Sequence, residues 1–334
     1  MRRFPPLPDL DDPDAPDGVL EGHLWLLELI DGTGLRFRMD ESGLLRFGGP
    51  EAVYDDLDAV PIAVRPAVRH VRDRFDREAL RRAVADPAGV TFFGVATHRR
   101  GTDYDWDRIP PFLGTDVWRG ADGEAEENGE SEENGEGEEN GAFRPPDAAA
   151  AIFDGVGLDP VNAVAREVNA RDFDPEGYVV PASAWRDGPA AGVVVRNKRG
   201  GRGKILRETS DGTSGDGAGG EGAGGGGASD DGAEGDRYAA PPAPDELAAA
   251  HAGRERFDRV VAALERRGEP ATVDRLADRT VEAVARETPL RFGGAETASV
   301  GVDIARFRAS VVERARAFLD EPRDGDHGGP GGAE

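Results

Sequence analysis

Cysteine is absent from the 334-residue chain, and lysine is almost absent. The first absence excludes disulfide bonds, thiolate metal sites and cysteine nucleophiles. The second leaves Lys198 and Lys204 as the two lysines among 41 basic residues. Any reaction that needs a primary amine from this chain therefore has only those two candidates.

Long apolar runs are also missing. No segment approaches the ~20 apolar residues that a membrane-spanning helix needs. The opening MRRFPPLPDLDD lacks the apolar core of a signal peptide. The five histidines show no metal-ligand spacing, so no metal site is predicted from them. We therefore expect a cytoplasmic protein without a membrane partner.

Negative charge dominates the sequence, with 66 acidic and 41 basic residues and a formal charge of −25. Ten acidic residues and no basic ones lie within 120–142, and eight more, again without basic ones, lie within 208–236. The remainder carries about −7. Abundant carboxylates with so little lysine resemble proteins from a salt-rich cytoplasm, where screening over a few ångströms weakens repulsion between acidic groups.

Two low-complexity segments divide the chain. Residues 120–142 repeat EENGE-like units, and residues 208–237 form a glycine-rich linker. Neither contains enough apolar residues to bury a core, so both are expected to be disordered, as is the tail 321–334. The ordered pieces are then 1–119, 143–207 and 238–320.

The first piece has the pattern of strands followed by helices and further strands. Strands are predicted at 23–30, 35–39, 44–47, 90–96 and 112–118, and helices at 62–75 and 77–85. A turn at 31–34 separates the first two strands. The second piece has a predicted helix at 146–153 and strands at 192–196 and 204–206.

The third piece shows three apolar stripes at helical spacing. They are Phe257, Val260, Val261 and Leu264; Val273, Leu276, Val281 and Val284; and Ile304, Phe307, Val311 and Phe318. Asp303 stands where the last of these helices needs an N-terminal cap. A helical bundle is predicted.

Six short segments follow one another in the first two pieces. They read ELIDGTGLRF at 28–37, RFG at 46–48, FFGV at 92–95, FLGTDVW at 112–118, AGVVVR at 191–196 and RGKI at 202–205. Each is weak alone. In this order and at these intervals they resemble the motifs of ATP-dependent polynucleotide ligases of the RNA ligase type, within the covalent nucleotidyltransferase superfamily.

The resemblance implies an α+β fold. Residues 1–119 and 143–207 would form the two parts of a nucleotidyltransferase domain of antiparallel sheets with flanking helices, interrupted by the acidic insertion. Residues 238–320 would add a C-terminal helical domain. The family uses ATP and Mg²⁺ as cofactors, and its partners are nucleotides and nucleic-acid ends.

Three positions that carry charge in the family are apolar here. The family's first motif supplies a lysine that attacks the α-phosphate of ATP, and its counterpart is Leu29, with Gly34 in place of asparagine. The ribose-binding glutamate is replaced by Val95, and the metal-binding glutamate by Ala191. No catalytic residue is therefore assigned, and Asp31 and Asp116 alone would be a poor cage for Mg²⁺.

The positions that bind ligands in the family resemble the family pattern more closely than the catalytic positions do. By resemblance, the nucleotide-binding residues are Glu28, Asp31, Gly32, Phe93, Arg196, Arg202 and Lys204. The nucleic-acid-binding residues are Arg46, Lys198 and Arg199. The run RNKRGGRGKILR at 196–207 has six basic side chains and no acid, which indicates a local phosphate site or a solvated surface turn.

Three functions agree with these residues. The first is a catalytically degenerate ligase-family protein that still holds ATP or nucleic-acid ends. The second is an active ligase that uses a displaced nucleophile or accepts preadenylated ends. The third is a non-catalytic interaction protein that acts through its helical domain.

Overall fold

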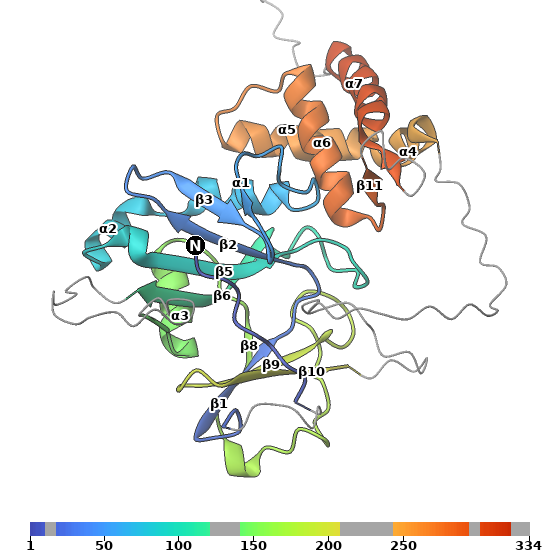
Figure 1. The fold of residues 1–334 in the computed structure, drawn as a ribbon. Helices are drawn as coiled ribbons and strands as arrows, with labels where there is room; N and C mark the ends of the chain where they lie inside the picture. Colours follow the sequence, from blue (N-terminus) through green and yellow to red (C-terminus); the bar gives the residue numbers. More distant parts are fainter. Residues whose placement is uncertain (11–17, 121–140, 208–242, 294–300, 322–334) are drawn as a thin grey trace, which may run out of the picture. The chain divides into compact units, whose positions relative to one another are not determined.

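The computed structural model describes residues 1–10, 18–120, 141–207, 243–293 and 301–321, drawn in colour in Figure 1. The predicted disorder of the acidic insertion, the glycine-rich linker and the tail concerns segments that lie almost wholly outside these residues. The chain divides into two compact units, 1–228 and 229–334, and each is described separately below.

A six-stranded antiparallel sheet forms the larger part of the first unit (Figure 1). Its order is β4-β3-β2-β5-β6-β7. The strands are β2 (Thr33–Met39), β3 (Leu45–Gly48), β4 (Val53–Tyr54), β5 (Val90–Ala96), β6 (Phe112–Gly120) and β7 (Gly141–Phe143). The order follows the sequence except that β5 pairs with β2, because the helical segment between β4 and β5 returns the chain across the sheet.

A second antiparallel sheet has four strands in the order β10-β9-β1-β8. They are β1 (His23–Glu28), β8 (Ala163–Asn169), β9 (Gly192–Asn197) and β10 (Arg202–Leu206). The first strand of the chain is therefore central here, between β9 and β8.

The turn predicted at 31–34 is not a hairpin. β1 pairs with β8 and β9, whereas β2 pairs with β3 and β5, so the two strands belong to different sheets. Residues 29–32 carry the chain from one sheet to the other. A two-residue hairpin needs each strand to offer its free edge to the other, and β1 is already paired on both edges.

Three helices cover one face of the six-stranded sheet. They are α1 (Arg65–Arg74), α2 (Arg77–Ala83) and α3 (Pro146–Gly155). Strand residues Leu35, Phe37 and Phe92 pack with helix residues Val68 and Phe153 in one apolar core. Phe37 and Phe92 lie stacked, with ring centroids 4.9 Å apart. Because side chains alternate along a strand, the neighbouring residues of β2 and β5 point to the opposite face.

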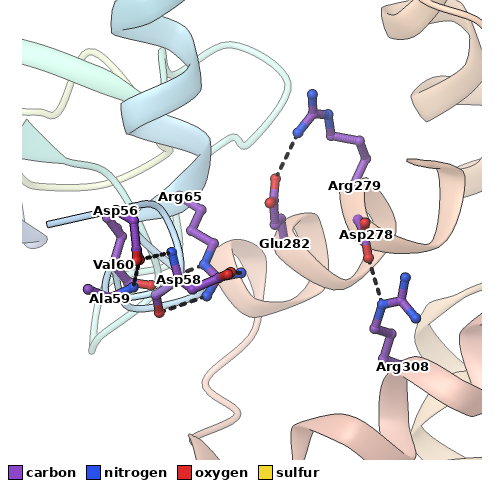
Figure 2. A network of polar contacts seen from close by, with 9 residues as sticks. All are labelled: Asp56, Asp58, Ala59, Val60, Arg65, Asp278, Arg279, Glu282 and Arg308. Carbon is purple, nitrogen blue, oxygen red and sulfur yellow. Dashed lines mark hydrogen bonds and ion pairs between the residues drawn. The ribbon is translucent and has the colours of Figure 1, made fainter. Parts of the chain in front are cut away.

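The loop that leads into α1 is fixed by its own polar groups (Figure 2). Asp56 Oδ1 accepts hydrogen bonds from the backbone N–H groups of Asp58 and Ala59. Arg65 donates to the carbonyl oxygens of Val60 and Asp58. These contacts satisfy backbone groups that a loop outside a sheet would otherwise leave to water.

The second unit is mainly helical. It contains α4 (Pro244–His251), α5 (Arg254–Arg266), α6 (Val273–Glu287) and α7 (Ile304–Asp320), with a short parallel pair β11 (Phe292–Gly293) and β12 (Val302–Asp303). Asp303 caps α7 by accepting from the N–H groups of Ala305 and Arg306, as predicted. Figure 2 also shows the Arg308–Asp278 pair that joins α7 to α6.

The predicted fold class, antiparallel sheets with flanking helices and a C-terminal helical part, is confirmed. The strands β4, β7, β8, β11 and β12 and the helix α4 were missed. β8 reads AVAREVN and is only half-buried, so it lacks the apolar alternation of the other strands. Within the described segments, no helix has the length and apolar character needed to cross a membrane.

We expect Phe92→Ala to lower the free energy of unfolding of the first unit by about 3 to 5 kcal/mol, because it removes a buried ring from the sheet–helix core. Val179→Ala is the control, since Val179 is 85% exposed, and it should change stability by less than ~0.5 kcal/mol. Chemical denaturation at constant salt measures both. Equal losses in the two variants would contradict this account of the core.

Candidate nucleotide and nucleic-acid site

The motif segments meet where the two sheets face each other. On the side of the six-stranded sheet away from the helices, here called the inner face, lie Arg36, Arg38, Arg46, Phe93 and Asp116. Arg36, Phe93 and Asp116 are direct cross-strand neighbours on β2, β5 and β6. The four-stranded sheet offers a matching row, in which Arg202, Arg196 and Trp25 are paired neighbours on β10, β9 and β1.

Apolar side chains fill part of the space between the sheets. Trp25 and Leu27 of β1 pack with Leu113 of β6, and Val95 and Val194 lie against this cluster. The motif resemblance predicts Val95 at the position of a ribose-binding glutamate. A carboxylate there would be surrounded by apolar groups, so the valine fits the packing that this chain has adopted.

Leu29 lies beside the segment that carries Ala191. Its backbone N–H donates to Gly192 O at 3.0 Å, and a side chain at Gly192 would meet Leu29 Cδ2 at 3.1 Å. The structure thus brings two of the altered motif positions together. The side chains of leucine and alanine have no lone pair or charge, so neither Leu29 nor Ala191 can act as a nucleophile or a metal ligand.

Glu28 is buried and holds a neighbouring loop. Its Oε1 accepts from Ser183 Oγ at 2.5 Å, and its Oε2 accepts from Ala184 N at 3.1 Å. The side chain is 2% exposed. Both oxygens therefore accept hydrogen bonds inside the protein, and the Glu28 carboxylate supports the 183–185 loop.

Asp31 and Gly32 occupy the crossing between the sheets. Asp31 Oδ2 accepts from the N–H groups of Gly101 and Thr102, and the Asp31 N–H donates to the Tyr104 hydroxyl. Burial raises the pKa of Tyr104 to about 12, so the phenol stays protonated. A Cβ at Gly32 would stand 2.5 Å from the carbonyl oxygen of Ala96, so only glycine lets the crossing lie this close to β5.

A buried ion-pair cluster joins the two sheets. Asp116 Oδ1 lies 2.9 Å from Arg196 Nη1 and 2.8 Å from Arg202 Nη1. Arg196 also donates to the carbonyl oxygens of Thr115 and Arg144, at 3.0 and 3.2 Å. Arg202 stacks over the ring of Phe143 at 4.5 Å. We call Arg196, Asp116 and Arg202 the intersheet clamp.

The electrostatics of the intersheet clamp favour the charged forms. Burial alone would raise the pKa of Asp116, but the neighbouring Arg196 and Arg202 guanidiniums hold it below its usual value. Burial lowers the pKa of Arg196, against the attraction of Asp116. Two guanidiniums and one carboxylate leave one net positive charge in a buried place.

The remaining basic residues of the predicted site also have acidic partners. Lys204 Nζ lies 3.5 Å from Asp9, Lys198 Nζ lies 2.7 Å from Glu167, and Arg199 and Arg46 pair with Glu21 and Asp40 at 3.0 Å. Lys204 is buried, whereas Lys198, Arg199 and Arg46 are solvent-accessible at their ends. Lys204 also lies on the same side of β10 as Arg202, because the two residues are separated by one position along the strand.

The N-terminal segment 1–10 covers part of the inner face, which the sequence did not predict. Phe4 packs edge-on against Phe93, with centroids 5.1 Å apart. Further along, Leu10 N donates to Lys204 O and Lys204 N to Pro8 O, both at 2.9 Å. The ring of Phe93, which the sequence predicted to bind a nucleotide, thus already contacts another ring. In the sequence, the apolar residues Phe4 and Leu10 beside several prolines were the feature that could have indicated this contact.

The residues present do not fit a catalytic Mg²⁺. Throughout the described segments, no three His, Asp or Glu side chains gather as a metal site would require. The sequence offered Asp31 and Asp116 as metal ligands, and both already accept hydrogen bonds from the protein. Mg²⁺ prefers carboxylates that are free to coordinate it in octahedral geometry.

Comparisons with known proteins give one kind of match. No protein-family model and no curated protein sequence matches the chain. An archaeal ATP-dependent RNA ligase structure is similar at 13% identity and a TM-score of 0.38, over 62% of this chain and 48% of that chain. An RNA ligase of Naegleria gruberi with PPi is similar at 9% identity and a TM-score of 0.42, over 62% and 56%. The chain spans about half the length of these ligases.

The intersheet clamp gives a stability prediction. Asp116→Asn leaves two buried guanidiniums without their counter-charge, so the free energy of unfolding should fall by about 3 to 5 kcal/mol. The control is Asp147→Asn, because the Asp147 carboxylate is half exposed and pairs with Lys198 at the surface. Its loss should be below ~1 kcal/mol.

Comparing the wild type with Asp116→Asn at different pH values gives a further prediction. Because the pKa of Asp116 is held low in the folded chain, its contribution is complete above about pH 4, where an unfolded aspartate is ionised. The contribution is lost as the pH falls toward the lower pKa of the folded state. The stability difference between wild type and Asp116→Asn should therefore shrink below about pH 4. A difference that stays constant down to pH 2 would refute the charge argument.

Proposed function

We propose that this chain is a ligase-type nucleotidyltransferase that no longer forms a lysyl-adenylate and instead binds the phosphates of nucleic-acid ends. The observation that carries the proposal is Leu29, half-buried and hydrogen-bonded through its backbone to Gly192, at the position of the nucleophile. The acidic partners of the chemistry are replaced by Val95 and Ala191.

Neither lysine of the chain replaces the lost nucleophile. Lys198 donates to Glu167, and this hydrogen bond, together with the charges of Glu167 and Asp147, raises its pKa. A lysine with a raised pKa is protonated at neutral pH and has no lone pair to attack phosphorus. Lys204 is 7% exposed and lies against Asp9 at 3.5 Å.

The basic residues support binding without chemistry. Arg196, Arg202 and Lys204 present three positive charges along β9 and β10, against Asp116 and Asp9. A phosphate group offers the same oxygen acceptors as those carboxylates, and arginine recognises it in the same geometry. The ends of Lys198 and Arg199 lie in solvent next to this row, where they can meet a nucleic-acid backbone without a change of fold.

Adenylation is tested directly. The protein is incubated with α-labelled ATP and Mg²⁺ or Mn²⁺ at high salt and then denatured before separation. We expect no covalent label. A labelled wild-type protein would overturn the proposal, and mapping the label to Lys198 or Lys204 would establish the displaced nucleophile.

A gain-of-function variant tests the assignment of Leu29. Leu29→Lys with Val95→Glu and Ala191→Glu restores the three groups that the family uses, and we expect a detectable label from ATP. The matched control keeps Val95→Glu and Ala191→Glu with Leu29 unchanged, and it should stay unlabelled. A folded triple variant without label would count against the motif alignment.

Binding is measured separately from labelling. A fluorescent single-stranded oligonucleotide with a 5′-phosphate should bind the wild type, and Lys198→Gln with Arg199→Gln should weaken binding and flatten its salt dependence. Arg82→Gln, on the exposed side of α2, is the control and should bind like the wild type. Equal affinities in all three proteins would remove Lys198 and Arg199 from the proposed interface.

A further inference from the structure

Arg36 is an unusual buried charge on the inner face. It belongs to β2, where Leu35 and Phe37 on either side point into the helix-covered core. Arg36 is 2% exposed, yet its Nε and Nη1 atoms have no hydrogen-bond partner among the described residues. Arg38 Nε, on the same face two residues later, is likewise buried without a partner.

Among the described residues, no carboxylate forms an ion pair with Arg36. Arg36 lies over the ring of Phe4 at 5.9 Å. Burial lowers its pKa, and the nearby positive charge of Arg3 lowers it further, while Tyr54 acts in the opposite sense. A guanidinium nevertheless keeps its proton in proteins. A buried cation beside a second cation therefore needs an anion from elsewhere.

Glycine at position 48 lets the Arg36 side chain lie close against β3. Arg36 faces Gly48 on β3, and a side chain there would come within 3.1 Å of Arg36 Nε. Arg46 stands opposite Arg38 on the same strand pair. Three arginines thus line the β2–β3 half of the inner face around a position without a side chain, while Asp40 pairs with the outermost of them, Arg46.

We propose that the β2–β3 half of the inner face is an anion site, in which Arg36 and Arg38 bind the tetrahedral oxygens of a phosphate group. The two unpartnered nitrogens of Arg36, Nε and Nη1, point to different sides of the guanidinium, so each can donate to a phosphate oxygen on its own side. Arg38 supplies a third donor. This site lies on β2 and β3, apart from the basic row on β9 and β10, and neither Arg36 nor Arg38 was predicted from the sequence to bind a ligand.

The N-terminal segment is the cover of this site. Phe4 lies over both Arg36 and Gly34, since a Cβ at Gly34 would meet the Phe4 ring at 2.9 Å. Residues 1–7 contain Pro5 and Pro6, which have no N–H to donate, and no backbone hydrogen bond to the rest of the described chain is recorded before Pro8. A phosphate can therefore reach Arg36 when residues 1–7 move aside, without any strand being unpaired.

Phosphate-dependent thermal stability tests the site with the full chain. Inorganic phosphate is titrated against chloride at constant high ionic strength, because a ligand that binds only the folded state raises the melting temperature. We expect a rise of about 3 °C or more in the wild type. Arg36→Met should remove this rise, or weaken the apparent phosphate affinity by about tenfold or more.

The variants also separate binding from folding. Without phosphate, Arg36→Met should melt at the wild-type temperature or higher, because it removes an uncompensated buried charge. Arg38→Met should weaken the phosphate response with little change in phosphate-free melting. Arg82→Met is the matched control, an arginine exposed on α2, and should respond like the wild type. A wild type that does not respond to phosphate, or an Arg36→Met protein that responds fully, would overturn the site.

Comparing inorganic phosphate with a 5′-phosphorylated oligonucleotide shows which phosphate the site binds. The comparison also tests the anion site separately from the proposed function, on which the nucleic-acid part of this inference rests. A 5′-phosphorylated oligonucleotide that stabilises the wild type but not Arg36→Met places a nucleic-acid end in the site. If inorganic phosphate acts through Arg36 and the oligonucleotide binds nowhere, the anion site stands and the proposed nucleic-acid function fails. If the oligonucleotide binds equally to both proteins, nucleic-acid binding stands and this site is not its end-binding position.

Discussion

The first unit depends on the contact between Asp116 and its two arginines. The two sheets share no strand, so the backbone ladders of one cannot stabilise the other. What joins them is an apolar cluster on one side and the intersheet clamp on the other. A buried carboxylate between two guanidiniums is directional, so it fixes the spacing of β6 against β9 and β10 where an apolar contact would allow sliding. The position of every motif residue follows from that spacing.

Other polar residues of the motif segments also have partners within the protein. Glu28 holds the 183–185 loop, Asp31 holds residues 101–104, and Arg196 spans the sheets. Buried polar groups are stable in a folded protein when they are hydrogen-bonded. These three side chains therefore have a structural role, whatever ligand the first unit binds.

Much of the fold could be predicted from the sequence, because strands such as Val90–Ala96 and helices such as Ile304–Asp320 carry clear periodicity. β8 could not, since its half-buried face has little apolar pattern. The separation of β1 from β2 was hidden because an Asp-Gly dipeptide suits a hairpin and a crossing equally well. For the site, sequence identified the basic row but not its partners Asp9 and Glu167, nor the cover by Phe4, since these contacts join residues far apart in the chain.

The placement of β1 also shapes how the first unit reaches its native state. Strands β2, β3, β5 and β6 pair within about ninety residues of one another, whereas His23 on β1 pairs with Asn169 on β8 and Leu24 with Asn197 on β9. Closing such long loops is slow, because the chain entropy is lost before the contact is gained. During synthesis, the apolar segment HLWLLE leaves the ribosome early and waits for partners made much later. β1 is therefore exposed to mispairing until its partners β8 and β9 have been made.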